Sequence, residues 1–181
     1  MPPGGYSSPV PDLTRVRETG RLRLEPIGER HAADLFTLYS DPPVAEWFGE
    51  WTREGAAREV SRMAGGWRAD GVHKWMAYDR ATGDLIGRGG LSRAPVDGAV
   101  RLELGWVLLG RFWGRGFATE IGRAGLAVAF EELDAREVVA FTEVHNARSR
   151  AVMERLGMVY AKDIDHDGAP FALYRKIRRL P

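Results

Sequence analysis

The sequence predicts a single domain of mixed α/β fold, with the element order β-α-α-β-β-β-α-β-α-β-β. Two observations carry the prediction. Short runs alternate apolar with polar residues, as strands do, and between them lie longer runs whose apolar residues recur every three or four positions, as on one face of a helix. The 181 residues suffice to bury a sizeable core, and no repeat or internal boundary divides them.

The composition excludes several classes of protein. A formal charge of +1 gives no overall field that would point to nucleic acid or a membrane surface. The chain has no cysteine, which excludes disulfides, thiolate catalysis and Cys-ligated zinc. No apolar run approaches the roughly 20 residues of a membrane-spanning helix, and the first residues lack the apolar core of a signal peptide. We therefore expect a cytoplasmic protein with no nucleic-acid and no membrane partner.

The sequence of the N-terminal part predicts an arm, a strand and two helices. Residues 1–20 are rich in proline, glycine and serine, and we interpret them as a flexible arm before a domain at residues 21–181. Residues 21–26 alternate and stop at a proline, which predicts a strand. Residues 29–39 and 52–68 each place their apolar side chains on one helical face, which predicts two helices.

A predicted hairpin leads to the central strand. Residues 74–79 and 84–91 have the pattern of two strands, joined by a turn at residues 81–83. Residues 95–98 then turn into a strand at residues 101–109, in which apolar side chains occupy every second position.

A glycine-rich loop follows the central strand and opens a helix. Residues 111–116 contain two arginines and two glycines in the pattern R-x-x-G-x-G, and the period of residues 117–133 is helical. Glycines let backbone N–H groups approach a ligand closely, and a helix N-terminus adds partial positive charge, so this order of elements is suited to binding phosphate. The pattern is neither the Rossmann nor the P-loop motif.

The C-terminal part predicts a strand, a short helix and a hairpin. Residues 136–144 form the strand. Asn146 can cap the helix that follows, because its side-chain oxygen can accept a hydrogen bond from the first turn, and Gly157 ends it. Residues 158–164 and 171–177 then form two strands around a turn.

Two stretches together resemble the GNAT superfamily of acyl-CoA-dependent N-acetyltransferases. They are the R-x-x-G-x-G loop with its continuation GFATEI, and the later segment NARSRAVMERLGM. Within the superfamily the chain looks most similar to the ribosomal-protein N-terminal acetyltransferases. The resemblance covers about residues 21–178, and it implies a mostly antiparallel, GNAT-like sheet whose central strand and next strand splay apart, flanked by helices.

The resemblance also implies where acetyl-CoA binds. The pantetheine arm would lie in the gap between the splayed strands, because an extra strand-like chain can satisfy backbone groups that have lost a neighbour. Backbone N–H groups of the loop would hold the pyrophosphate. The expected cofactor-binding residues are Trp106, Val107, Leu108, Arg111, Gly114, Arg115, Gly116, Phe117, Ala118, Thr119, Asn146 and Ser149, with Arg148 or Arg150 as a candidate for the ribose phosphate.

Candidate catalytic residues follow from the same comparison. Similar enzymes often use a carboxylate at the position of Glu103 as general base, since an ammonium group must lose a proton before it attacks a thioester. The alternative for Glu103 is a structural ion pair with an arginine of a neighbouring strand. His145 and Asp167 are further candidates for the base. Ser149 is the candidate for the acid that protonates the leaving thiolate, because Met153 occupies the position where many relatives place a tyrosine.

The segment between the first two helices carries Trp47, Phe48 and Trp51. In similar folds this segment borders the acceptor, so the three side chains are candidates for a substrate-binding wall. Packing between the two helices is an equally supported interpretation. Asp41-Pro42-Pro43 is expected to end the first helix.

The sequence thus predicts an enzyme that moves an acetyl group from acetyl-CoA to a primary amine in a ternary complex. The thioester oxygen would be stabilised by a main-chain N–H near Val107. The acceptor is left open between a protein N-terminus and a small molecule such as a polyamine, an amino sugar or an antibiotic. An alternative of another class is a non-catalytic acyl-CoA-binding regulatory module. No histidine spacing suggests a metal site, and the resemblance is compatible with a homodimer.

Overall fold

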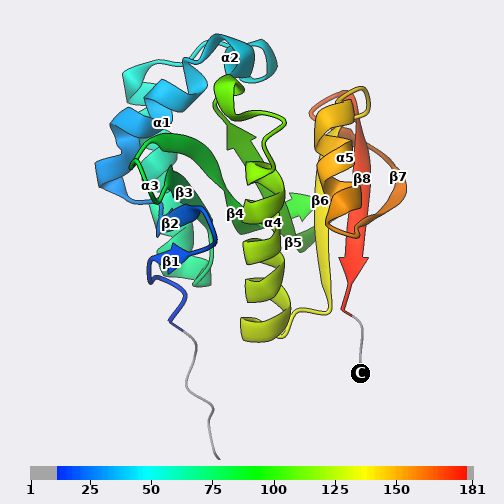
Figure 1. Ribbon diagram of the computed structural model, residues 1–181. Coiled ribbons are helices and arrows are strands. Elements are labelled where there is room, and N and C mark those ends of the chain that lie inside the picture. The colour runs from blue at the N-terminus through cyan, green and yellow to red at the C-terminus, as the bar shows by residue number, and fades with distance from the viewer. Residues whose placement is uncertain (1–11, 179–181) are drawn as a thin grey trace, which may run out of the picture.

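The computed structural model describes residues 12–178, and eight strands in this range form one open sheet (Figure 1). In chain order the strands are β1 (Arg17–Glu18), β2 (Leu22–Pro26), β3 (Lys74–Asp79), β4 (Leu85–Val96), β5 (Ala99–Leu108), β6 (Glu137–Glu143), β7 (Val159–His166) and β8 (Ala169–Ile177). They lie in the order β1-β2-β3-β4-β5-β6-β8-β7, and only β5 and β6 are parallel neighbours. The predicted fold, a mixed α/β domain with a mostly antiparallel sheet, is confirmed.

Helices cover both faces of the sheet. They are α1 (Ala32–Tyr39), α2 (Pro42–Phe48), α3 (Arg53–Asp70), α4 (Phe117–Ala127) and α5 (Ala147–Arg155), with the short turns η1 (Glu29–His31), η2 (Gly110–Phe112) and the π-helical η3 (Val128–Glu132). The close fit of α4 to one face depends on Gly125, because a Cβ there would lie 2.6 Å from Leu104 Cδ1 of β5. On the other face, Tyr39 of α1 accepts a hydrogen bond from Arg88 of β4. Figure 1 shows α5 standing in front of β6 and β8.

Local signals explain where most helices begin and end. The side chain of Thr52 accepts a hydrogen bond from Gly55 N at 3.0 Å and caps α3, and Gly71 ends this helix with φ 68°. Asn146 Oδ1 accepts a hydrogen bond from Ser149 N at 3.1 Å, so the predicted cap of α5 is present. The first helix ends at Tyr39, just before Asp41-Pro42-Pro43, as expected. Pro42 is also the first residue of α2, a helix that the sequence did not predict, where a proline needs no hydrogen-bond partner for its nitrogen.

The hairpin of β4 and β5 is longer than the sequence predicts. The expected first strand ended at residue 91, whereas β4 continues to Val96 and turns through Asp97 and Gly98, both with positive φ. The longer β4 pairs with β5 without interruption from Gly87, opposite Leu108, to Val96, opposite Ala99, and this pairing holds its last residues in the strand.

The stretch predicted to be a flexible arm is described only in part. Residues 1–11 lie outside the described residues. Residues 12–20 contact the domain: β1 pairs with β2, Leu13 is buried, and Arg17 forms an ion pair of 2.6 Å with Glu132 of η3.

The sheet splays between β5 and β6. The two strands are bridged only where Glu103 lies opposite Val139, about midway along β5. Beyond this bridge, the C-terminal halves of both strands line the cleft, so the strands separate toward their C-terminal ends. There β5 leads into η2 and α4, and β6 leads into α5. This geometry matches the V-shaped gap that the resemblance implies.

Candidate active site

A cleft with a volume of about 1460 Å³ opens where β5 and β6 separate. Its walls come from many parts of the chain. They are β4 with β5, the start of β3, the end of β6, the loop that leads into α4 with α4 itself, the end of α2, part of α3, helix α5, the turn between β7 and β8, and the residues just before β2. The cleft reaches both faces of the sheet, so one molecule that enters beside α4 can meet another that enters beside α2.

One edge of β5 offers unpaired backbone groups to the cleft. Leu109 N donates to Ile86 O at 3.0 Å, on the β4 side. Because hydrogen-bonding directions alternate along an antiparallel strand, Val107 also faces β4, whereas Trp106 and Leu108 face the gap. Consistent with this, a Cβ on Gly87 would lie 2.2 Å from Val107 O. Of the three predicted pantetheine contacts, Trp106 and Leu108 have the required backbone direction, and Val107 does not.

The glycine-rich loop presents N–H groups at the start of α4. Gly114 and Gly116 have φ of 73° and 82°, values that favour glycine. The first hydrogen bond of the helix runs from Glu120 N to Gly116 O at 3.0 Å, so the N–H groups of residues 117–119 have no partner within it. Phe117, Ala118 and Thr119 all line the cleft. The predicted phosphate cradle therefore has the donors that an anion requires.

Two arginines flank this cradle. The guanidinium carbon of Arg21 lies 4.2 Å from the ring centre of Phe117, and that of Arg115 lies 5.8 Å from it. Arg21 also donates to Arg115 O at 2.9 Å and forms an ion pair of 2.8 Å with Glu120. Burial opposes ionisation of Glu120, but hydrogen bonds from Thr19 and Arg21 outweigh it and lower the pKa. Arg21, which the sequence did not single out, orders the predicted loop.

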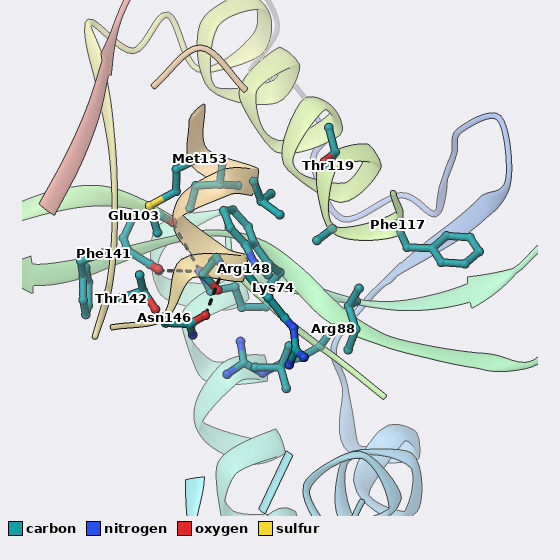
Figure 2. Close-up of a pocket in the computed structure, with 18 of the residues that line it drawn as sticks. Lys74, Arg88, Glu103, Phe117, Thr119, Phe141, Thr142, Asn146, Arg148 and Met153 are labelled. Atoms are coloured by element: carbon teal, nitrogen blue, oxygen red, sulfur yellow. Dashed lines mark hydrogen bonds and ion pairs between the residues drawn. The ribbon is translucent and has the colours of Figure 1, made fainter. Parts of the chain in front are cut away.

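Helix α5 forms the opposite wall near the cradle. Asn146, Arg148 and Met153 line the cleft (Figure 2), and so does Ser149. The guanidinium carbon of Arg148 lies 4.8 Å from the ring centre of Trp113, whose Nε1 donates to Leu108 O at 2.8 Å. This contact joins α5 to the end of β5 across the gap.

A buried ion pair lies on the face of the sheet away from α4. Lys74 Nζ lies 2.5 Å from Glu103 Oε2, and the side chains are 6% and 13% exposed. Ser92 Oγ donates to the same oxygen at 3.1 Å. Glu103 Oε1 has no hydrogen-bond partner within residues 12–178. The ion-pair interpretation of Glu103 thus holds, but its partner is the lysine of β3 rather than an arginine, and one oxygen stays available for the cleft.

Bare backbone makes room for the Lys74 side chain. The Lys74 side chain crosses β4, where its Nζ donates to Gly90 O at 2.9 Å, and it reaches β5 beside Gly105. A Cβ on Gly105 would lie 2.6 Å from Glu103 Oε1 and 3.3 Å from Lys74 Nζ. Burial lowers the pKa of the Lys74 ammonium, and the neighbouring Glu103 carboxylate opposes this shift.

His73 lies on the same face and is neutral near pH 7. Burial, followed by the positive charges of Lys74, Arg62 and Arg88, lowers its pKa to about 4. His73 Nδ1 accepts a hydrogen bond from Lys74 N at 2.9 Å, so the proton of the neutral ring is assigned to Nε2. The ring packs against bare Gly66 of α3, where a Cβ would lie 2.2 Å from His73 Cδ2.

The three aromatic residues of the predicted substrate wall do not all lie in the cleft. Trp47 and Phe48 line the cleft, as that interpretation requires. Trp47 stacks on His145 with ring centres 5.4 Å apart, which links α2 to the end of β6. Trp51 is not among the lining residues; it stacks on Tyr39 at 4.1 Å and has the packing role of the alternative interpretation.

The alternative bases lie toward the solvent. The side chain of His145 is 67% exposed, and its Nε2 lies 3.3 Å from Glu143 Oε2. Asp167 occupies the turn between β7 and β8 with φ 54°, and its side chain is 95% exposed. Both are more exposed than Glu103. Within residues 12–178, no three potential metal-ligating side chains come together, and no helix is long and apolar enough to span a membrane.

Sequence reasoning missed Lys74, Arg88, Ser92 and His73, all of which line the cleft. Lys74 carried the only usable signal, a charge directly before the apolar and aromatic run WMAY of its strand, since a buried charge requires a partner. Nothing local identifies the other three.

Comparison with known proteins gives consistent matches. A family model described as an acetyltransferase (GNAT) domain matches residues 21–159. YkkB of Bacillus subtilis, which is uncharacterized, is 31% identical over 160 residues, covering 87% of this chain and 93% of that protein. YdaF of the same organism, named provisionally as a ribosomal N-acetyltransferase, is 30% identical over 117 residues, or 59% of this chain and 61% of its own length. A solved structure from Bordetella pertussis, assigned provisionally to the GNAT acetyltransferases, has a TM-score of 0.81 and 25% identity and covers 90% of this chain and 99% of its own.

Proposed function

Since the chain belongs to the GNAT acetyltransferase family, we propose that it transfers the acetyl group of acetyl-CoA to a primary amine by direct attack in a ternary complex. Membership confirms the resemblance and the expectation of an N-acetyltransferase. The ternary complex, the acceptor and the roles of individual residues belong to the proposal.

The single observation that supports the placement of acetyl-CoA most strongly is the open edge of β5 beside the start of α4. The N–H and C=O of Trp106 and the N–H of Leu108 face the gap beside β6, whereas Leu108 O already accepts from Trp113 Nε1. An amide-rich pantetheine arm can pair with the remaining groups as a strand would. The N–H groups at the start of α4 suit the pyrophosphate, and the partial positive charge of the helix end adds to them. Arg21, Arg115 and Arg148 add positive charge near the same end of the cleft.

When bound, acetyl-CoA supplies the activated acetyl thioester. A gap-facing main-chain N–H, that of Trp106 or Leu108, is placed to donate to the thioester oxygen. Both residues flank Val107, near which the donor was expected; the N–H of Val107 itself faces β4. Ser149 is proposed to donate a proton toward the sulfur, since its hydroxyl has no hydrogen-bond partner within the described residues and it lines the cleft.

Glu103 is proposed to accept the proton of the acceptor amine, through a water. Its Oε2 is held by Lys74 and Ser92, which orients the carboxylate, and Oε1 remains for the water.

The test is an acetyl-transfer assay with a panel of amines. Thiol release from acetyl-CoA, corrected for hydrolysis, is measured together with the mass of the acetylated product. Acetylated amine, formed at a rate that saturates in both substrates with intersecting kinetics, is the expected result. Tight CoA binding by calorimetry without any acetylated product across the panel would favour the non-catalytic acyl-CoA-binding module instead.

The acceptor of this reaction is a protein N-terminus or a small amine. YdaF, named provisionally as a ribosomal N-acetyltransferase, supports the first class. Peptides and small amines therefore both belong in the panel.

A further inference from the structure

Arg88 of β4 keeps one edge of its guanidinium group free. Its Nε donates to Tyr39 OH at 2.8 Å, and Nη2 donates to the same oxygen. Within residues 12–178, Nη1 has no acceptor and no carboxylate lies within ion-pair distance of Arg88. The Nη1–Nη2 edge thus presents two parallel N–H donors, the geometry that binds a carboxylate through both of its oxygens.

The strand register places this edge in the acceptor half of the cleft. Arg88 lies opposite Val107, two residues along β4 from Gly90, and Ser92 lies opposite Glu103. Alternate residues of a strand share a face, so Arg88 is on the same face as the Lys74–Glu103 pair and away from α4. Arg88 lines the cleft, and Figure 2 shows it in the same pocket as Lys74 and Glu103.

The other cleft-lining charges on this face are already paired. Arg62 forms an ion pair of 2.6 Å with Glu59, and Lys74 forms one with Glu103. His73, with its pKa lowered to about 4, is neutral near pH 7. Arg88 therefore leaves this part of the cleft with an uncompensated positive charge.

Other carboxylates of the cleft lie elsewhere. Glu120, which lies on α4, forms an ion pair with Arg21. Glu143 and Asp167 lie across the gap, at the end of β6 and in the turn between β7 and β8. A half-buried cation without an anion is costly unless a ligand supplies one.

We propose that the acceptor is a primary amine that carries a carboxylate, and that the free edge of Arg88 binds this carboxylate while the amine lies toward Glu103. The inference rests on the proposed acetyl transfer, because it names the acceptor class of the same site. A polyamine or an amino sugar has only positive charges to offer, and Arg88 repels it. The same carboxylate chemistry occurs in a free amino acid and in a peptide whose second residue is acidic.

Matched pairs of amines test the assignment. The pairs are L-phenylalanine with L-phenylalaninamide, β-alanine with β-alaninamide, and a short peptide beginning Ala-Glu with one beginning Ala-Gln. The amide of an amino acid has the less basic amine, so chemistry alone favours the amide, and a preference for the acid reports recognition. The wild type is expected to show a kcat/KM roughly ten- to hundred-fold higher for the acid of at least one pair, as for one charge-assisted contact. Whether the amino acids or the peptides show the preference identifies the source of the carboxylate.

Two variants assign the preference to a residue. Arg88→Gln is expected to reduce the acid-to-amide ratio to about one, mainly through KM, and Arg88→Lys to restore part of it. Arg93→Gln is the matched control. Arg93 lies on the same strand and also lines the cleft, but its side chain is on the opposite face of the sheet from Glu103, so its acid-to-amide ratio is expected to equal that of the wild type. CoA affinity by calorimetry and the thermal midpoint establish that each variant is folded.

Binding to the CoA-loaded protein separates this inference from the proposed reaction. If no panel member is acetylated but the acids bind to the wild type and not to Arg88→Gln, the acetyl transfer fails and the Arg88 assignment stands. Equal use and equal binding of acid and amide by the wild type would overturn it, as would an unchanged ratio in Arg88→Gln or the binding of no acid at all.

Discussion

Lys74 and Glu103 form an ion pair across the bare Cα of Gly105, with Nζ 2.5 Å from Oε2. The two residues come from β3 and β5, and the lysine side chain passes over the intervening strand at Gly90 to reach its partner. The pair fixes the proposed base in the cleft and compensates a buried ammonium group at the same time.

Removal of the lysine should destabilise the fold more than removal of both charges. Lys74→Met leaves Glu103 with an uncompensated charge and is expected to cost about 3 kcal/mol of unfolding free energy, the lower part of the range for a broken buried pair, because Glu103 is partly exposed. The double variant Lys74→Met, Glu103→Gln should recover more than half of that loss. Urea unfolding measures both; equal stabilities of the single and double variants would show that the pair is not coupled.

Glu103→Gln should lower turnover in a pH-dependent way. The expected loss is about a hundredfold near neutral pH, toward the lower end for a general base, with little change in the affinity for CoA. The loss should shrink as pH rises, because more of the acceptor amine is then already deprotonated. A loss that is constant across pH would assign the base elsewhere, with His145 and Asp167 as the next residues to substitute.

Gly116→Val should weaken CoA binding. A β-branched residue is strained at φ 82°, and its side chain covers the N–H groups at the start of α4. We expect roughly a tenfold or greater rise in the dissociation constant by calorimetry. Gly83→Val is the control, because Gly83 has φ 80° in the turn between β3 and β4, where a Cβ meets nothing within 4 Å. If both variants bound CoA like the wild type, the pyrophosphate would have to lie elsewhere.

Ser149→Ala should reduce kcat modestly, by about tenfold or less, because a thiolate leaves readily without an acid. Met153 lies one turn further along α5, is buried, and also lines the cleft. Met153→Ala is therefore expected to lower the thermal midpoint or the affinity for CoA rather than the chemical rate. Full activity of Ser149→Ala would mean that the thiolate departs unprotonated or is protonated by water.

Acid should destabilise the protein through His73. The folded state lowers the pKa of this histidine from 6.5 to about 4, so the unfolded state binds the proton first as the pH falls. The stability contribution of the neutral ring is complete above pH 6.5 and is lost between about 6.5 and 4. One pH unit of pKa displacement corresponds to about 1.4 kcal/mol, so the full loss is on the order of 3 kcal/mol.

His73→Asn is the variant that isolates this effect. Asparagine keeps a side-chain acceptor for Lys74 N but does not titrate. Unfolding free energies measured from pH 7.5 to 4.5 should therefore fall more steeply for the wild type than for the variant. Parallel curves would show that His73 titrates alike in the folded and unfolded states.

Local patterns in the sequence identified most of the elements and the two stretches that carry the family resemblance. Strand alternation, the cap at Asn146 and the positive φ of Gly114 and Gly116 depend on residues within a few positions of one another, so they can be read along the chain. The helix α2 was missed. The same prolines that follow the end of α1 also occupy its first turn, and the sequence analysis used them only as a stop signal.

The sequence by itself therefore determined the fold class, the family and the glycine-rich loop. Only the tertiary structure determined which side chains meet in the cleft. Lys74, Arg88 and Glu103 come together because β3, β4 and β5 pair in one register, and a shift of one residue would turn each side chain to the opposite face. Trp47 and Trp51 are equally aromatic in the sequence. Helix α2 carries Trp47 to the cleft, whereas Trp51, beyond the end of this helix, stacks on Tyr39. Contacts between residues distant in the chain depend on strand register and helix packing, which no local pattern encodes.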